Sequence, residues 1–165
     1  MKQLPQSQEM RRHMVDSQLR TSGVNAPWLI AAMLAMPREA FVPGDSTAAY
    51  MDRSVPLGHG RMLNPPLAAG LMLSAAEPGP DDKILLIGAA TGYLAALLAP
   101  RVASLVAVEE PGPLAEAFRA NLPDVELVEG PLAEGAADRA PYDLIIIDGA
   151  IEQLPDALAG QLADG

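Results

Sequence analysis

The stretch ILLIGAATGYLAALLA at residues 84–99 constrains the fold more than any other part of the sequence. An unbroken apolar run leads directly into Gly88 and Gly92, and a second apolar run rich in alanine and leucine follows. This order predicts a buried strand, a tight turn and the first turns of a helix. In a parallel sheet such a turn lies at the carboxyl edge, where ligands bind.

The same alternation continues to the end of the chain. Short apolar runs predict strands at residues 84–87, 105–108, 125–128 and 144–147. Helical patterns separate or follow them near residues 93–99, 113–121 and 152–162. An order of strand, helix and strand predicts an α/β fold with a parallel sheet and helices on its faces.

The first 80 residues have a different, mainly helical pattern. A first helix is expected from about Ser7 to a stop at Gly23, and a second from a cap at Asn25 to a stop at Pro37. A third helix follows a cap at Asn64 and ends at the Pro-Gly-Pro turn of residues 78–80. The segment between the last two helices is long and punctuated by glycine, as binding loops often are.

Composition excludes several kinds of site. The 165 residues include no cysteine and only two histidines, so disulfides, thiolate metal sites and histidine-rich metal sites are not expected. The first 20 residues lack the apolar run of a signal peptide, and no stretch has the roughly 18 apolar residues of a membrane span. These features favour a cytoplasmic protein of one structural domain, with no membrane partner.

Charge is distributed unevenly between the two halves. Residues 1–80 contain 7 Lys and Arg against 6 Asp and Glu, whereas residues 81–165 contain 4 against 15, a net charge of −11. An acidic surface repels polyanions, so a nucleic-acid partner is not expected. The simplest interpretation of the acidic half is a well-solvated surface.

The glycine turn favours one class of ligand. A dinucleotide fingerprint needs glycine at 88, 90 and 93, but the sequence has Ala90 and Tyr93 at two of these positions. The spacing is nearer to the G-x-G-x-G turn of S-adenosylmethionine enzymes. Glu109 closes the second strand, where a carboxylate can accept hydrogen bonds from both ribose hydroxyls. The alternative is a bare strand-to-helix turn beside a solvated carboxylate.

A resemblance extends over nearly the whole chain. The run "MVDSQLRTSGV … WLIAAMLAMPREAFVP … AYMDRSVPLGHGRMLNPPLAAGLM … DDKILLIGAATGYLAALLA … VAVEE … APYDLIIIDGA … QLADG" resembles the protein-L-isoaspartate O-methyltransferase family. The resemblance implies a class I S-adenosylmethionine-dependent methyltransferase fold, which is Rossmann-like, with an N-terminal helical extension. It also implies methyl transfer to the carboxylate of damaged aspartyl residues in proteins. Residues 1–80 would form the helical and covering-loop region, and residues 81–165 the cofactor-binding region.

The resemblance also implies which residues form the site. Those expected to bind the donor are Gly88, Ala89, Ala90, Gly92, Tyr93, Glu109 and Glu129. Asn64, Asp148 and His59 are the candidates for contact with the acceptor. Each candidate also has a purely structural interpretation: Asn64 as the helix cap, Asp148 as a solvated strand end or cap, and His59 as an exposed loop side chain.

Three positions depart from the family pattern. Ala90 replaces a loop glycine, Asn64 replaces a serine implicated in activity, and Pro131 stands where an acidic residue usually reads the adenine amino group. Adenine recognition would then use Glu129 or the backbone of Leu132. Three hypotheses follow: an isoaspartyl methyltransferase, a methyltransferase of this fold with another small acceptor, and a non-catalytic binding module.

The end of the sequence suggests a further expectation. The family's sheet continues beyond the fourth strand, whereas QLADG reads as a helix end with Gly165 as its stop. Residues 144–147 would be left with an unpaired edge. We therefore expect either a fragment that lacks C-terminal strands or a homodimer that pairs along this edge.

Overall fold

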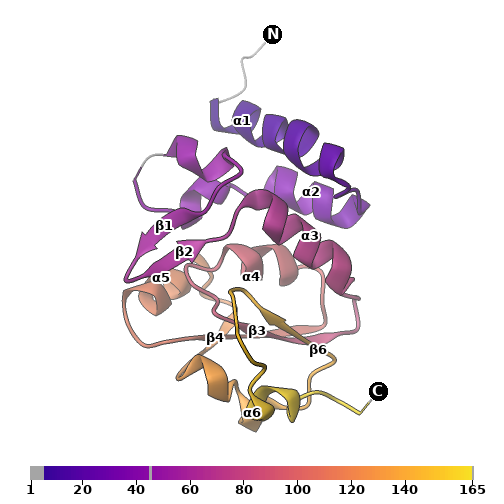
Figure 1. Ribbon diagram of the computed structural model, residues 1–165, viewed down its shortest axis with the longest axis vertical. Coiled ribbons are helices and arrows are strands. Elements are labelled where there is room, and N and C mark those ends of the chain that lie inside the picture. Colours follow the sequence, from indigo (N-terminus) through magenta and orange to yellow (C-terminus); the bar gives the residue numbers. More distant parts are fainter. Residues whose placement is uncertain (1–5, 45, 165) are drawn as a thin grey trace. The chain divides into compact units, whose positions relative to one another are not determined.

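The computed structural model describes residues 6–44 and 46–164 (Figure 1). The chain forms two compact units, Met1–Glu77 and Pro78–Gly165. No helix in the described ranges is long and apolar enough to cross a bilayer. Within the same ranges, no group of three or more His, Asp or Glu side chains is arranged to hold a metal ion.

The first unit begins with a helix of changing pitch. The α-helix α1 (Gln6–Met14) continues as the π-helix η1 (Val15–Leu19) and the 3₁₀ turn η2 (Arg20–Ser22). Gly23 ends this run in a left-handed conformation with φ of 91°, which confirms the predicted stop. The wide turn was not predicted, because apolar spacing over five residues does not distinguish a π-helix from an α-helix.

The next helices begin at prolines. Helix α2 (Pro27–Ala35) has Ala26 at its N-cap and no side-chain cap hydrogen bond, so the cap expected at Asn25 is wrong. Helix α3 (Pro66–Ala76) likewise has Pro65 at its N-cap. A proline in the first turn lacks the amide that a cap would satisfy, and its fixed φ already suits the helix.

The segment between α2 and α3 is more ordered than the loop that the sequence predicted. It contains the 3₁₀ turns η3 (Arg38–Phe41) and η4 (Ser46–Tyr50) and the antiparallel hairpin of β1 (Val55–Gly58) and β2 (Arg61–Leu63). The strands are short, and the register shifts between Pro56 and Gly58, so the alternation that identifies a strand is broken.

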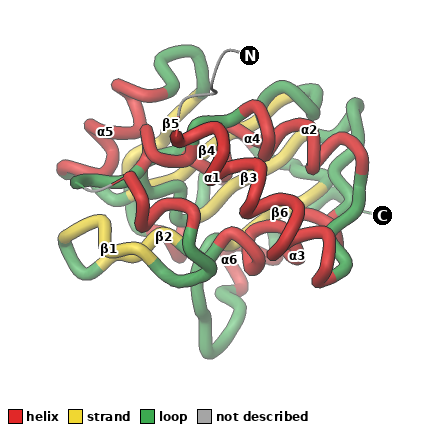
Figure 2. The backbone as a smooth tube through the Cα atoms, turned by 90° about the horizontal axis from the view of Figure 1, so that it is seen from above, coloured by secondary structure: helices red, strands yellow, loops and turns green. Residues whose placement is uncertain are grey.

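The second unit contains a four-stranded parallel sheet (Figure 2). Its strands, in the spatial order β5-β4-β3-β6, are β3 (Lys83–Ile87), β4 (Ser104–Glu109), β5 (Glu126–Glu129) and β6 (Leu144–Ile147). The predicted parallel α/β sheet is confirmed, and each predicted strand overlaps an observed one.

Helices lie on both faces of this sheet, as Figure 1 shows. Helices α4 (Tyr93–Leu98) and α5 (Pro113–Asn121) follow β3 and β4, and α6 (Asp156–Ala159) lies on the opposite face. Leu85, Ile87, Val106 and Val108 pack with Leu158 of α6 in one apolar cluster. Because side chains alternate along a strand, Glu109 projects on the other face from Val108.

The last helix is much shorter than the predicted segment 152–162. Helix α6 is a single turn that begins after Pro155 and ends at Gly160. The chain then forms a parallel bridge between Tyr142 and Leu162. The amide of Tyr142 donates to the carbonyl of Gln161 at 2.9 Å. These backbone bonds replace the last helical turns that the sequence pattern suggested.

Candidate functional site

The turn after β3 has an alternating backbone conformation. Gly88, Ala90 and Gly92 all have positive φ, at 76°, 49° and 100°. Glycine adopts this region without cost, whereas alanine is rare there. Ala90 therefore keeps the backbone path of the glycine that the G-x-G-x-G pattern would place at this position.

Most amides of this turn bind the protein itself. The amides of Gly88 and Ala89 both donate to the carbonyl of Val108, at 3.0 and 3.1 Å, and that of Gly92 donates to the carbonyl of Ala89 at 2.9 Å. These three amides are therefore already paired within the second unit. At Gly92 the lack of a side chain allows the end of α5 to approach the turn closely, because a Cβ atom there would lie 2.8 Å from Cδ1 of Leu122.

Glu109 lies directly beside this turn. Its Oε2 atom accepts a hydrogen bond from the amide of Ala90 at 2.6 Å, and its Oε1 atom accepts one from the amide of Glu110 at 3.0 Å. The side chain is 1% exposed. The predicted placement of Glu109 and the turn at one sheet edge is confirmed. A carboxylate has about four acceptor positions, so it can accept from several donors at once.

A second acidic residue ends the neighbouring strand. Glu129 is paired with Glu109 in the register of β4 and β5, so both side chains project on the same face of the sheet. Arg119 of α5 forms an ion pair with the Glu129 carboxylate. This cation offsets part of the repulsion between two neighbouring carboxylates.

Two other predicted residues also lie at this edge. Asp148 follows β6, and its amide donates to the carbonyl of Ile87 at 2.9 Å, which places its backbone next to the first residue of the turn. Tyr93 is the first residue of α4 and is 1% exposed, so its side chain belongs to the core of the second unit.

His59 and Asn64 belong to the first unit. His59 lies at the tip of the β1–β2 hairpin, is exposed, and has φ of 53° between two glycines that also have positive φ. Asn64 is not the cap of α3, because Pro65 occupies that position and the amide of Leu67 donates to Oδ1 of Asp52 at 3.2 Å. The carbonyl of Asn64 accepts a hydrogen bond from the buried guanidinium of Arg38.

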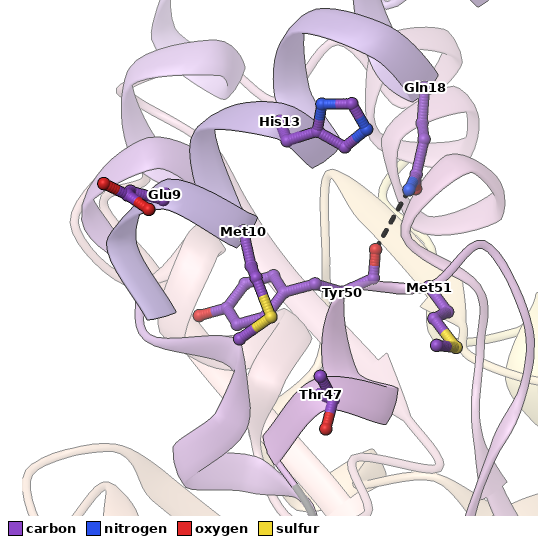
Figure 3. Close-up of a pocket in the computed structure, with 7 residues that line it drawn as sticks. All are labelled: Glu9, Met10, His13, Gln18, Thr47, Tyr50 and Met51. Carbon is purple, nitrogen blue, oxygen red and sulfur yellow. Dashed lines mark hydrogen bonds between the residues drawn. The ribbon is translucent and has the colours of Figure 1, made fainter. Parts of the chain in front are cut away.

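The first unit also contains an open pocket of about 380 Å³ (Figure 3). It is lined by Glu9, Met10, His13, Gln18, Thr47, Tyr50 and Met51. Figure 3 shows Gln18 reaching the backbone of Tyr50, where its Nε2 atom donates to the carbonyl at 3.0 Å. The methionines and the Tyr50 ring make the lining mainly apolar.

Tyr50, which lines this pocket, also takes part in a charged network. Its hydroxyl donates to the Glu39 carboxylate and accepts from Nε of Arg11 at 3.0 Å. Burial, together with the bond to Glu39, raises the pKa of Tyr50 to about 12. Burial alone would raise the pKa of Glu39, but the bond from Tyr50 and the charge of Arg11 outweigh it and hold this pKa below its ordinary value.

The glycine turn, the buried carboxylate of Glu109 beside it and the parallel sheet together define a class I S-adenosylmethionine-dependent methyltransferase fold. A sequence profile of the protein-L-isoaspartate(D-aspartate) O-methyltransferase family matches residues 9–165. The chain belongs to this family.

Individual relatives agree with the profile. A protein-L-isoaspartate O-methyltransferase of Methanoregula boonei is 39% identical over 97% of this chain and 76% of its own length. One from Koribacter versatilis is 37% identical over 94% of this chain and 72% of its own length. A crystal structure of a Plasmodium falciparum protein-L-isoaspartate O-methyltransferase with S-adenosyl-L-homocysteine has a TM-score of 0.79 at 16% identity, and covers 98% of this chain and 81% of that one.

Proposed function

We propose that this protein transfers the methyl group of S-adenosylmethionine to the side-chain carboxylate of isoaspartyl residues in damaged proteins. The observation that carries the proposal is the pairing of Glu109 with the Gly88–Gly92 turn at the carboxyl edge of the sheet. Family membership supports the reaction and the acceptor.

The residues present fit the adenosyl part of the donor. Glu109 is a carboxylate at the end of β4, directly beside the turn, and carboxylate oxygens are suitable acceptors for ribose hydroxyls. Gly88 and Gly92 adopt the positive φ values that shape the turn beside the proposed donor site. Glu129 is the neighbouring acceptor for the adenine amino group, since Pro131 has no polar side chain and is exposed. Ala89 contributes backbone to this site.

Donor binding at Glu109 requires a local rearrangement. The side chain is 1% exposed, so a ribose cannot reach its carboxylate until neighbouring atoms move. The two amide bonds keep the carboxylate in place while this happens. We therefore expect the free and donor-bound forms to differ in the protection of the amides around the turn.

Methyl transfer to a carboxylate depends on the alignment of donor and acceptor and needs no proton transfer. The donor supplies an activated methyl group, and the acceptor is already an anion, so no general base is needed. Asp148 is suited to orient the substrate through a peptide N–H. His59 and Asn64 are the proposed acceptor contacts from the first unit, and the left-handed backbone of His59 is the kind of local strain that occurs at functional sites.

The proposed partners and location follow from the same chemistry. The acceptor is a protein or peptide, and the net charge of −11 over residues 81–165 argues against a nucleic acid. The absence of cysteine fits a reducing cytoplasm. We also propose that two copies of this chain pair along the edge of β6 as a homodimer.

Two measurements test the proposal. Calorimetry with S-adenosylhomocysteine should show binding to the folded protein, and Glu109→Ala should weaken it. Methyl incorporation should then occur in an isoaspartyl peptide and not in the same peptide with ordinary aspartate. Donor binding without methylation of the isoaspartyl peptide would favour the hypothesis of another acceptor. Absence of donor binding up to millimolar ligand would favour a non-catalytic module and end the proposal.

A further inference from the structure

Helix α5 ends against the turn that the proposed function assigns to the donor. We propose that Asn121, the last residue of α5, is a positioning residue that fixes the shape of this turn and so sets the affinity for the donor. The inference rests on the proposed donor site. Neither the glycine pattern nor the family resemblance pointed to Asn121.

A side-chain hydrogen bond joins the helix to the turn. The Nδ2 atom of Asn121 donates to the carbonyl of Thr91 at 2.9 Å. Thr91 lies between Ala90 and Gly92, both of which have positive φ. The Thr91 carbonyl belongs to the peptide that joins Thr91 to Gly92, and glycine tolerates the change in φ that accompanies rotation of this peptide. The bond from Asn121 holds the Thr91 carbonyl in one orientation.

Packing at the same place limits movement further. A Cβ atom on Gly92 would lie 2.8 Å from Cδ1 of Leu122 and 3.1 Å from Cδ2 of Phe118. The end of α5 therefore touches two successive residues of the turn, one by a hydrogen bond and one by close van der Waals contact. Phe118 is fully buried, which fixes this end of the helix in the core.

The effect reaches the donor through Ala90. Its amide donates to the Glu109 carboxylate, and Ala90 is joined to the Thr91–Gly92 peptide through Thr91, so a rotation of that peptide shifts the donor of the bond. Asn121 thus supports Glu109 indirectly, through the backbone of the turn. Its side chain binds the backbone carbonyl of Thr91, so this role needs no contact between Asn121 and the ligand.

Asparagine suits this position better than its close relatives. Aspartate has the same shape but no donor, and its charge would lie at the negative end of the helix dipole. Asn121→Ala removes the bond, and Asn121→Asp removes it while keeping the side-chain volume. Glu116→Ala is the matched control, because Glu116 is an exposed residue of the same helix.

The test compares these variants with the unaltered protein well below the unfolding temperature. Both Asn121 variants should raise the Kd for S-adenosylhomocysteine by about 2- to 10-fold, the equivalent of one lost hydrogen bond. The KM for the donor should rise in step, with that for the peptide unchanged. In the free protein, hydrogen exchange at Ala90 and Gly92 should become faster. Glu116→Ala should change none of these.

The outcomes separate the two proposals. If the unaltered protein binds S-adenosylhomocysteine and both Asn121 variants bind it equally well, the positioning role is wrong. Unchanged exchange at Ala90 and Gly92 would also overturn it, without any ligand. If the unaltered protein does not bind S-adenosylhomocysteine, the proposed function fails, and the exchange measurement still decides whether Asn121 fixes the turn.

Discussion

The amide of Ala90 and the Oε2 atom of Glu109 are 2.6 Å apart, and they join the turn after β3 to the end of β4. A charge-assisted bond of this length fixes both partners. The carboxylate that we assign to the ribose is therefore positioned by the turn before any ligand arrives, and the turn is held by the carboxylate.

Removal of this carboxylate should abolish most donor binding. Glu109→Ala should raise the Kd for S-adenosylhomocysteine by about 10- to 100-fold, because hydrogen bonds to charged groups contribute more than neutral ones. Glu109→Gln should have a smaller effect, since its amide oxygen still accepts. Calorimetry measures both, with circular dichroism to confirm folding. Equal affinities for the alanine variant and the unaltered protein would exclude Glu109 from the site.

Ala90 should be a strained position that glycine relieves. Its φ of 49° costs an alanine roughly 1–2 kcal/mol, and the entropy cost of glycine offsets about 0.5–1 kcal/mol of the relief, so Ala90→Gly should raise the free energy of unfolding by roughly 0.5–1 kcal/mol. The neighbouring Ala89→Gly is the control, because Ala89 does not have positive φ and should lose a similar amount. Denaturant unfolding of the two variants should therefore shift in opposite directions. A loss of stability in both would contradict the strain argument.

The network around Tyr50 should make stability depend on alkaline pH. The pKa of Tyr50 is raised from 10.0 to about 12, so the folded state holds the phenol proton more tightly than the unfolded state does. This contribution is fully present below pH 10 and is lost as the pH rises to 12. Tyr50→Phe should flatten that part of the curve of unfolding free energy against pH.

Tyr142→Phe is the comparison, because burial also raises the pKa of Tyr142. The alkaline losses of unfolding free energy caused by Tyr50 and by Tyr142 should add, because the two tyrosines lie in different units and bind different partners. An alkaline slope that survives the Tyr50 change in full would show that its proton does not stabilise the fold.

Gln161 should be one of the most sensitive polar residues for stability. It is 4% exposed, and its side chain accepts from the amide of Ala136 and donates to the carbonyls of Glu134 and Ala157. Gln161→Ala leaves these buried groups without their partner and should cost about 2–4 kcal/mol of unfolding free energy. Thermal unfolding checks this.

Gly135 offers a complementary test of the same contact. A Cβ atom there would lie 2.7 Å from Oε1 of Gln161, and the residue has φ of 64°. Gly135→Ala should therefore destabilise the protein on its own and cost less when combined with Gln161→Ala, which removes the contact with Gln161 but leaves Leu158 at 2.7 Å and the positive φ. Full additivity of the two changes would contradict this arrangement.

The sequence predicted the sheet well because apolar runs and helical periods are local signals. Residues 84–87 and 144–147 are unbroken apolar runs, and they lie next to each other in the sheet as β3 and β6. The length of α6 could not be predicted in this way. The bond between Tyr142 and Gln161 joins distant residues and ends the helix early, so its effect depends on the tertiary fold.

The residues of the candidate site differ in the same way: some follow from local sequence and others depend on the tertiary fold. Glu109 could be predicted because a strand end after a glycine turn fixes its edge in advance. Asn121 could not be predicted, because an asparagine at the end of a helix carries no sequence signal of such a role. Only the folded structure places its side chain against the carbonyl of Thr91. The sequence also does not show that the carbonyl of Val108 accepts from the amides of both Gly88 and Ala89.

The strand order also bears on how the protein emerges from the ribosome. Synthesis releases β3, β4 and β5 first, and β3 is then the edge of a three-stranded sheet. Its second neighbour, β6, is made only after residues 88–143 have been added. Until then an apolar strand has an open row of backbone groups that can pair with other chains. Slow translation before residue 144 should therefore favour aggregation of the nascent protein, and chaperone binding at β3 should counter it.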